Sequence, residues 1–302
     1  TPQIAENPKM ISMAKSASER KKATPAQQAA IRRYLATGDH DPNLHLWPGQ
    51  NFMELEINTH TALRGALIDA VKERAAKVPK LPSIRTGDVS SLTRSKVAPM
   101  VNGLFAKSEQ AAVMNALERS VVFLTPDNVE PVLESSSWLH TSWVLANMYL
   151  LSIGAEALSP QAPSIVGLSE ETTCYVSIDY LLDQNPEPLA DYLVHEVAHI
   201  IHNCKRGAIG LEQTRRREWL LDIDYQMRET FAYCCEAYSR ILVLGTTGRQ
   251  RRELLAEHAG QTMITDASVD QDEYHDILRE AVSARNGWKR ILARCSGAKG
   301  KV

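Results

Sequence analysis

Residues 189–203 read LADYLVHEVAHIIHN, and this stretch contains the pattern that decides the expected fold and chemistry. Two prolines precede it, and apolar residues then recur at the spacing of a helix that starts near Leu189. His195 and His199 are four residues apart, so both imidazoles project from one face of that helix. The stretch predicts a buried helix that presents two imidazoles and, between them, the carboxylate of Glu196. The surrounding positions are all uncharged: Leu193, Val194, Val197, Ala198, Ile200 and Ile201.

Two neutral imidazoles at this spacing can reach one Zn²⁺ ion at about 2.0–2.1 Å. Glu196 follows the first histidine directly, close enough to hold a water at the metal without occupying the metal itself. This H-E-x-x-H arrangement is typical of zinc metalloproteases, in which the Glu acts as general base. The alternative is a core helix whose two histidines are satisfied by ordinary hydrogen bonds.

A zinc site of this kind needs a third protein ligand. Metzincins take theirs from H-E-x-x-H-x-x-G-x-x-H, but here His202 stands at the Gly position and Lys205 at the final position. The metzincin interpretation therefore fails. His202 lies a further turn along the same face, too far to join the same tetrahedral ion. We expect His202 to hydrogen-bond to a metal ligand without binding the metal itself, to face the substrate, or to be an ordinary polar residue.

A second informative stretch runs over residues 217–242. Apolar residues at helical spacing predict a core stripe, namely Trp219, Ile223, Met227, Phe231, Cys234, Tyr238 and Ile241. Three arginines, residues 215–217, are expected at the head of this helix. Glu229 and Glu236 lie on another face, and burying two carboxylates is costly unless each is paired or binds metal. A metal facing Glu229 accounts for that cost, and the small Ala232 lets the two helices approach closely.

Together these stretches resemble the gluzincins, H-E-x-x-H metallopeptidases whose third ligand is a Glu on a later helix. The resemblance covers about residues 172–242. It implies that His195, His199 and Glu229 bind one Zn²⁺ per chain and that Glu196 activates the water. Glu236 either accepts the other ring N–H of a ligand histidine or is the rival third ligand. The family adds a Tyr or His donor for the oxyanion, and the candidates are Tyr225, Tyr233, Tyr238, His258 and His275.

Residues 172–178 alternate in the manner of a β-strand just before the helix. By the family layout, we expect this segment to be an edge strand that pairs with the extended backbone of a substrate. That mode of binding makes an endopeptidase acting on proteins or peptides the expected enzyme.

The rest of the chain supports a mostly helical α+β fold, a zincin-like domain with a small sheet and an active-site helix. Apolar spacing predicts helices over residues 53–77, 107–119 and 137–153, and a short strand over 121–124. Residues 160–168 are expected to form a loop or an edge strand. Prolines predict an irregular segment from Pro79 to Pro99. We divide the chain into a flexible basic arm (1–28), a helical region (29–120) and a catalytic domain (121–302).

Composition sets limits on the class of protein. The 302 residues are 44% hydrophobic and 23% charged, which excludes a disordered or fibrous chain. A net charge of -2 gives no reason to expect the whole chain to coat DNA or a membrane. The five cysteines form no C-x-x-C pair and are expected to be reduced core thiols. With no signal-type apolar stretch at the start, we expect a cytoplasmic protein, or one exported without a classical signal peptide.

The sequence therefore favours a zinc-dependent peptidase whose partner is a protein or peptide substrate. A second interpretation is a zincin-fold sensor or binding module with a structural or vestigial zinc site, in which the N-terminal arm binds nucleic acid or a partner. The intact Glu196 argues against it, because a structural site needs no base. A third interpretation is a secreted effector protease, which would share the chemistry of the first and differ in its biological role. Substrate preference and oligomeric state are not predicted.

Overall fold

The computed structural model describes residues 23–42, 44–79, 86–182, 188–215, 217–261, 264 and 266–296. The described part of the chain is mostly helical and contains one three-stranded sheet, in agreement with the predicted α+β class. The helices are α1 (Pro25–Thr37), α2 (Phe52–Ala75), α3 (Thr86–Leu104), α4 (Lys107–Ser120), α5 (Val129–Ser135), α6 (Leu139–Ser152), α7 (Tyr192–Asn203), α8 (Arg228–Leu244), α9 (Gly248–Gln261), α10 (Gln271–Ser283) and α11 (Gly287–Cys295). The strands are β1 (Val121–Phe123), β2 (Gly167–Glu170) and β3 (Thr173–Val176).

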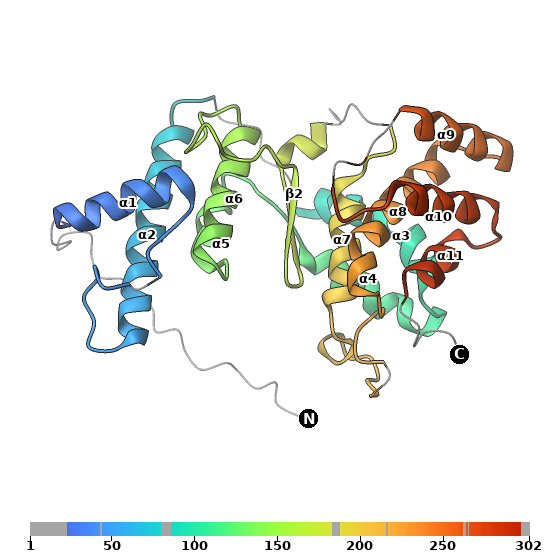
Figure 1. Ribbon diagram of the computed structural model, residues 1–302, viewed down its shortest axis with the longest axis horizontal. Coiled ribbons are helices and arrows are strands. Elements are labelled where there is room, and N and C mark those ends of the chain that lie inside the picture. The colour runs from blue at the N-terminus through green and yellow to red at the C-terminus, as the bar shows by residue number, and fades with distance from the viewer. Residues whose placement is uncertain are drawn as a thin grey trace.

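The sheet has the order β1-β3-β2 and lies between two groups of helices (Figure 1). β1 pairs in parallel with β3, and β2 returns antiparallel to β3 through a turn at Glu171, which has a positive φ of 52°. The strands expected at 121–124 and 172–178 are thus confirmed. The expectation that the second is an edge strand is wrong, because β3 is paired on both sides. The edge strands are β1 and β2, and β2 begins at the end of residues 160–168, the segment expected to be a loop or an edge strand.

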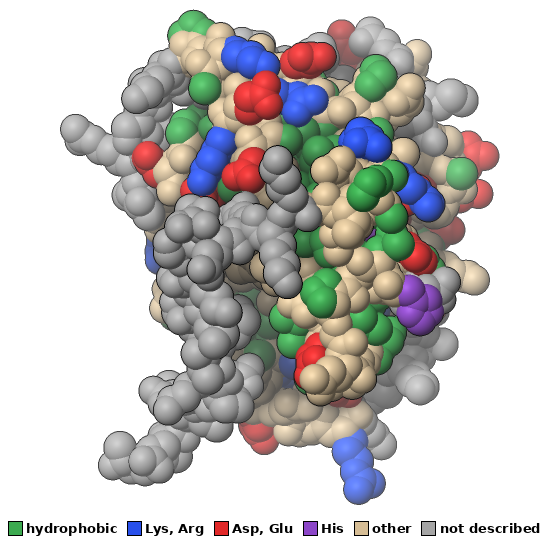
Figure 2. All heavy atoms as spheres, turned by 90° about the vertical axis from the view of Figure 1, so that its left-hand side faces the viewer, with side chains coloured by type: hydrophobic (Ala, Val, Ile, Leu, Met, Phe, Trp, Pro, Cys, Tyr) green, Lys and Arg blue, Asp and Glu red, His purple; other side chains and the backbone are tan. Residues whose placement is uncertain are grey.

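The first group of helices, α1, α2, α5 and α6, stands together on one side in Figure 1. Its core contains Leu63 and Leu67 of α2 and most of α6, which is buried on nearly all sides, as predicted for 137–153. Arg64 of α2 links α2 to α5 by donating to the backbone carbonyls of Glu134, in the last turn of α5, and of Ser136, just after it. Figure 2 views the molecule from this side, and acidic and basic side chains lie interspersed on the described part of that face.

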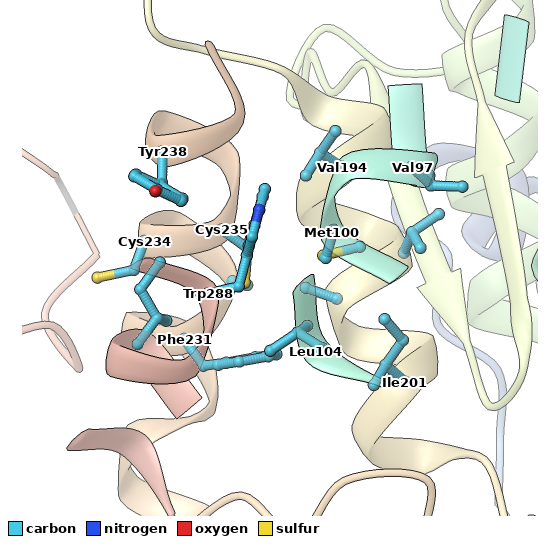
Figure 3. Packing of buried hydrophobic residues seen from close by; sticks show 14 of the residues in the cluster. Val97, Met100, Leu104, Val194, Ile201, Phe231, Cys234, Cys235, Tyr238 and Trp288 are labelled. Atoms are coloured by element: carbon cyan, nitrogen blue, oxygen red, sulfur yellow. The ribbon is translucent and has the colours of Figure 1, made fainter. Parts of the chain in front are cut away.

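The second group contains α3, α4 and α7–α11, and its core is the larger one. Figure 3 shows Val97, Met100 and Leu104 of α3 beside Val194 and Ile201 of α7. The prediction of an irregular segment up to Pro99 is therefore wrong over α3, which continues through that proline. A proline inside a helix costs roughly 3 kcal/mol. Burial of a whole apolar stripe, at about 1.5–3 kcal/mol per large side chain, outweighs it.

The apolar clusters do not separate at residue 120. α3 and α4 pack with α7, α8 and α11, whereas residues 124–168 pack with α1 and α2. The division into domains 29–120 and 121–302 stays a prediction, and the two apolar clusters each contain residues from both of these regions. Most of the predicted basic arm, residues 1–22, lies outside the described residues. α1 already begins at Pro25, with the Thr24 hydroxyl accepting from the Gln27 N–H as its N-cap.

The helix predicted from Arg217 onward begins instead at Arg228. The preceding segment is tied down as a loop, because the buried guanidinium of Arg206 donates to the Glu212 carbonyl and pairs with Glu109 of α4. The Leu220 N–H donates to the Cys204 carbonyl in the same loop. These long-range contacts override the helical spacing of residues 217–227, so Arg215 and Arg217 do not head a helix, while Arg216 lies outside the described residues.

All five cysteines are free and buried, as expected for core thiols. Within the described part of the chain, no helix combines the length and the apolar character needed to cross a bilayer.

Candidate metal centre

α7 carries the predicted histidines and is fixed at its start by Asp191. The Asp191 carboxylate accepts from the Val194 N–H, which caps the helix. One face of α7 enters the core through Leu193, Val197 and Ile201, and α8 packs closely along it. Ala232 of α8 is fully buried, in line with the close approach expected from its small side chain. The remaining face presents the histidines.

Three ligand-type atoms converge between α7 and α8. His195 Nε2 and His199 Nε2 lie 3.1 Å apart, and Glu229 Oε2 lies 3.7 Å and 3.4 Å from them, respectively. A tetrahedral zinc ion with bonds of about 2.05 Å separates its ligand atoms by about 3.3 Å. The spacing of His195, His199 and Glu229 is thus that of three corners of a zinc tetrahedron. Among the described residues, these three form the group suited to hold a metal ion.

The opposite ring nitrogens show which atoms are free to bind a cation. His195 Nδ1 lies 3.1 Å from Glu236 Oε2, and a carboxylate only accepts, so this Nδ1 donates. His199 Nδ1 lies 3.0 Å from His202 Nε2, while His202 Nδ1 donates to Asn203 Oδ1 at 3.1 Å. Neutral His202 therefore accepts from His199. When both rings are neutral, each Nε2 directs a lone pair toward the other Nε2 and toward the Glu229 carboxylate oxygen.

The charges around the site favour a positive occupant. Burial opposes a charge on His195, yet hydrogen bonding to Glu229 and Glu236 raises its pKa to about 10. Hydrogen bonds with the two histidines hold the pKa of Glu229 well below its usual value. Burial lowers the pKa of His202 to about 4, which keeps that ring neutral at neutral pH. These surroundings favour a positive charge between the three ligand atoms, and binding of a divalent cation there would be coupled to proton release.

Glu236 lies on the far side of His195 from Glu229. It accepts from the His195 ring and from the Asp191 backbone N–H, the latter at 2.7 Å, and is 6% exposed. This placement matches the predicted role of accepting a ligand's ring N–H and favours Glu229 over Glu236 as third ligand. His202 takes the corresponding place behind His199, the first of the roles expected for it.

A charged network behind Glu236 is absent from the sequence prediction. Asp191 accepts from Lys96 Nζ at 2.8 Å and from the Tyr180 hydroxyl at 2.6 Å, and is itself 2% exposed. Lys96 lies on α3, so the helix expected to be irregular supplies a cation behind the metal helix. No local sequence signal links Lys96 to Asp191, because 95 residues separate them.

Glu196 lies beside His195 on the wall of a pocket. Burial raises its pKa, against the lowering effect of the two imidazoles and of a hydrogen bond with Ser169 of β2. Gly167 of β2 is equally close, since a Cβ there would lie 3.0 Å from Glu196 Cγ. The edge strand therefore passes directly alongside the carboxylate predicted to be the base.

The three tyrosines proposed as oxyanion donors lie in different surroundings. Tyr233 packs edge-on against the His195 ring, with centroids 4.6 Å apart, and lines the pocket. Tyr238 is buried against Trp288, as Figure 3 shows, and Tyr225 is 81% exposed with the Arg228 guanidinium over its ring. Neither of the latter two lines the pocket, so the geometry retains Tyr233.

The pocket has a volume of about 350 Å³ and contains residues that the sequence reasoning did not assign. His258, one of the eligible donors, lines it beside Tyr274, and their Nε2 and hydroxyl groups lie 2.9 Å apart. His275 is not among the lining residues. Tyr192 also lines the pocket, and its position three residues before His195 on α7 is the signal that predicts it.

Comparisons with protein-family models, with curated proteins and with solved structures find no match to this chain.

Proposed function

We propose that this chain is a zinc-dependent peptidase. The observation that carries the proposal is the convergence of His195 Nε2, His199 Nε2 and Glu229 Oε2 at tetrahedral spacing, beside a pocket lined by Glu196. Each ligand histidine has an acceptor at its other ring nitrogen, the usual support of a metal-binding imidazole. A structural site does not require the additional buried carboxylate of Glu196.

The donor set suits zinc. Two imidazole nitrogens and one carboxylate oxygen form the three-ligand set of catalytic zinc sites, which keep a fourth position open. The Glu229 side chain is 36% exposed, whereas the histidines are only 11% and 12% exposed, so the side of the site at Glu229 is reachable from solvent. When bound, zinc supplies a Lewis acid that polarises the scissile carbonyl and increases the acidity of a water.

Glu196 then acts as general base and acid. Its carboxylate takes a proton from the attacking water, and the water oxygen bonds to the carbonyl carbon of the substrate. The C–N bond breaks as Glu196 delivers the same proton to the leaving amine. Burial raises the pKa of Glu196 toward the operating pH, which suits a group that must both accept and release a proton. Tyr233, against His195, is the donor best placed to stabilise the oxyanion.

We place the binding site of the substrate backbone at the outer edge of β2, the edge that faces away from β3. The Val166 carbonyl accepts from the Ser177 N–H, so by alternation Leu168 also faces β3. The backbone groups of Gly167 and Ser169 then point away from β3, at the edge that borders Glu196. An extended peptide pairing there would add a fourth strand.

The Glu196→Gln variant tests the mechanism. Gln keeps the size of the side chain but cannot take the proton, so we expect full zinc content and a loss of peptide cleavage of at least 10²-fold. Cleavage is measured by mass spectrometry on a mixed peptide library, with zinc content measured on the same samples. A variant that cuts at the wild-type rate would contradict the assignment. For the strand, a cleavable peptide N-methylated at single positions should lose cleavage at alternate residues. Equal cleavage of every methylated form would exclude pairing with β2.

A further inference from the structure

The pocket beside Glu196 has a composition that bears on the substrate. It is formed by residues 164–167 before and within β2, by the start of α7, and by α8, α9 and α10. A volume of about 350 Å³ is enough for a long side chain of a bound peptide. Because His195 and Glu196 form part of its wall, a side chain in this pocket belongs to a residue next to the cleaved bond.

Apart from His195, which the proposed zinc ion would hold neutral, the charges that line the pocket have one sign. Glu196 and Glu236 are its ionisable acidic residues, and no Lys or Arg occurs among its described lining residues. His258 adds no positive charge, because burial lowers its pKa to about 4. Two more carboxylates, those of Glu229 and Asp266, act on Tyr233 in the pocket wall. Four carboxylates thus outnumber the two positive charges that a bound zinc ion would bring.

The same pocket is rich in aromatic rings. Tyr192, Tyr233 and Tyr274 all line it, from the start of α7, from α8 and from α10. Tyrosine rings attract a cation of Lys or Arg over their faces, more strongly where water is excluded. Aliphatic residues such as Ile165 and Ala237 complete the wall and suit the methylene stem of such a side chain.

We infer that this pocket selects a basic side chain, Lys or Arg, at the residue next to the cleaved bond, and excludes an acidic one. The inference rests on the proposed peptidase function, whose substrate class it specifies. The carboxylates supply the favourable field and the tyrosine rings supply the contact, and the described lining residues include no Lys or Arg that could pair with an acidic side chain.

Three peptides that differ at one position test the selection. The residue next to the cleaved bond is Lys, Glu, or norleucine, which keeps the four-carbon stem of Lys but lacks the ammonium group. For wild type we expect kcat/KM on the Lys peptide to exceed that on the norleucine peptide by about 2- to 30-fold, the range of cation–π contacts. The Glu peptide should be the poorest substrate of the three. Equal rates for Lys and norleucine would overturn the inference.

A variant at the rim of the pocket tests whether charge, rather than the shape of the pocket, determines the preference for Lys. Ser164 is exposed and lines the pocket, so Ser164→Lys adds a cation there without disturbing the core. We expect this variant to lose the preference for Lys and to improve on the Glu peptide. Ala111→Lys, on an exposed position of α4 outside the pocket, adds the same charge as a matched control and should keep the wild-type order. An unchanged order in Ser164→Lys would contradict the inference.

Binding provides a readout that does not need turnover. The zinc-loaded Glu196→Gln protein, which keeps the carboxylates of Glu229, Glu236 and Asp266, is titrated into the three fluorescently labelled peptides, and anisotropy reports the affinity. We expect the order Lys, norleucine, Glu from tightest to weakest. If wild type cuts none of the peptides but the variant binds them in this order, the peptidase proposal fails and the selective pocket stands. If peptides are cut while affinities are independent of charge, the peptidase stands and the pocket inference fails. If no peptide is cut or bound, both are contradicted.

Discussion

Glu236→Gln tests how the protein prepares His195 to bind metal. The carboxylate has two acceptor oxygens, and two donors use them: the Asp191 N–H at 2.7 Å and His195 Nδ1 at 3.1 Å. A glutamine keeps the shape but offers one acceptor oxygen and one NH₂ group. In either orientation of the glutamine side-chain amide, one of the two original hydrogen bonds is lost. If the imidazole changes tautomer to accept from the NH₂ group, its Nε2 carries a proton and cannot bind zinc.

Two magnitudes follow from this geometry. Removing the outer partner of a ligand histidine typically lowers metal affinity 10- to 100-fold, which corresponds to about 1.4–2.7 kcal/mol. In the metal-free protein, a buried donor without its partner costs about 1–3 kcal/mol in the free energy of unfolding. Glu236 is only 6% exposed, so water does not replace the lost acceptor.

Zinc affinity is measured by competition with a chromophoric chelator, and stability by urea unfolding of the metal-free protein. Glu253→Gln, on the exposed α9 ion pair with Arg249, is the matched control and should change neither quantity by more than about 0.5 kcal/mol. A folded Glu236→Gln variant that binds zinc within twofold of wild type would refute the role assigned to this carboxylate.

Three further predictions concern the surroundings of the site. Lys96→Met, which removes the cation behind the α7 N-cap, should lower zinc affinity by less than the substitution above, measured in the same competition. Glu109→Gln leaves the guanidinium of Arg206, 2% exposed, without its counter-charge and should cost about 3 kcal/mol at pH 7 in urea unfolding. The pKa of Glu109 is lower in the folded protein than in the unfolded chain, so the difference in stability is fully present at a pH above the pKa of the unfolded chain. It should fade as the pH falls through the pKa of the folded protein. A difference that stays constant down to pH 3 would contradict the pairing. Gly103→Ala places a Cβ 2.1 Å from Trp288 Cδ1, and the clash should exceed the gain in helix propensity by about 2 kcal/mol in thermal or urea unfolding; an unchanged stability would show that the ring can move.

The sequence could predict the part of the site that depends on local periodicity. His195 and His199 share a helix face because four residues make about one turn, and α7 is apolar enough to form that helix. Glu229 and Glu236 are two turns apart on α8, and both reach His195. Local spacing and the family resemblance together therefore predicted the three residues that converge and the carboxylate behind His195.

The errors arose where contacts distant in sequence outweigh local preference. α3 forms despite Pro99 because α7 and α11 bury its apolar stripe. α8 starts eleven residues later than expected, at Arg228 rather than Arg217, because the Arg206 loop holds the intervening segment. β3 is central rather than an edge because β1, about 50 residues earlier, pairs with it. The pocket draws on five separate segments, so among its lining residues that were not predicted, only Tyr192, next to the motif, had a local signal.

The most direct test of the account is the zinc content of purified wild type, Glu229→Ala and Glu236→Ala, determined by elemental mass spectrometry after zinc is supplied and the excess removed. The account predicts one zinc per chain in wild type and none in Glu229→Ala. Glu236→Ala should still bind zinc when it is supplied in excess, but more weakly. Loss of zinc only with Glu236→Ala would move the third ligand to that residue. A wild-type protein that holds no zinc after resupply would contradict the metal centre, and α7 would then be a helix with two buried histidines.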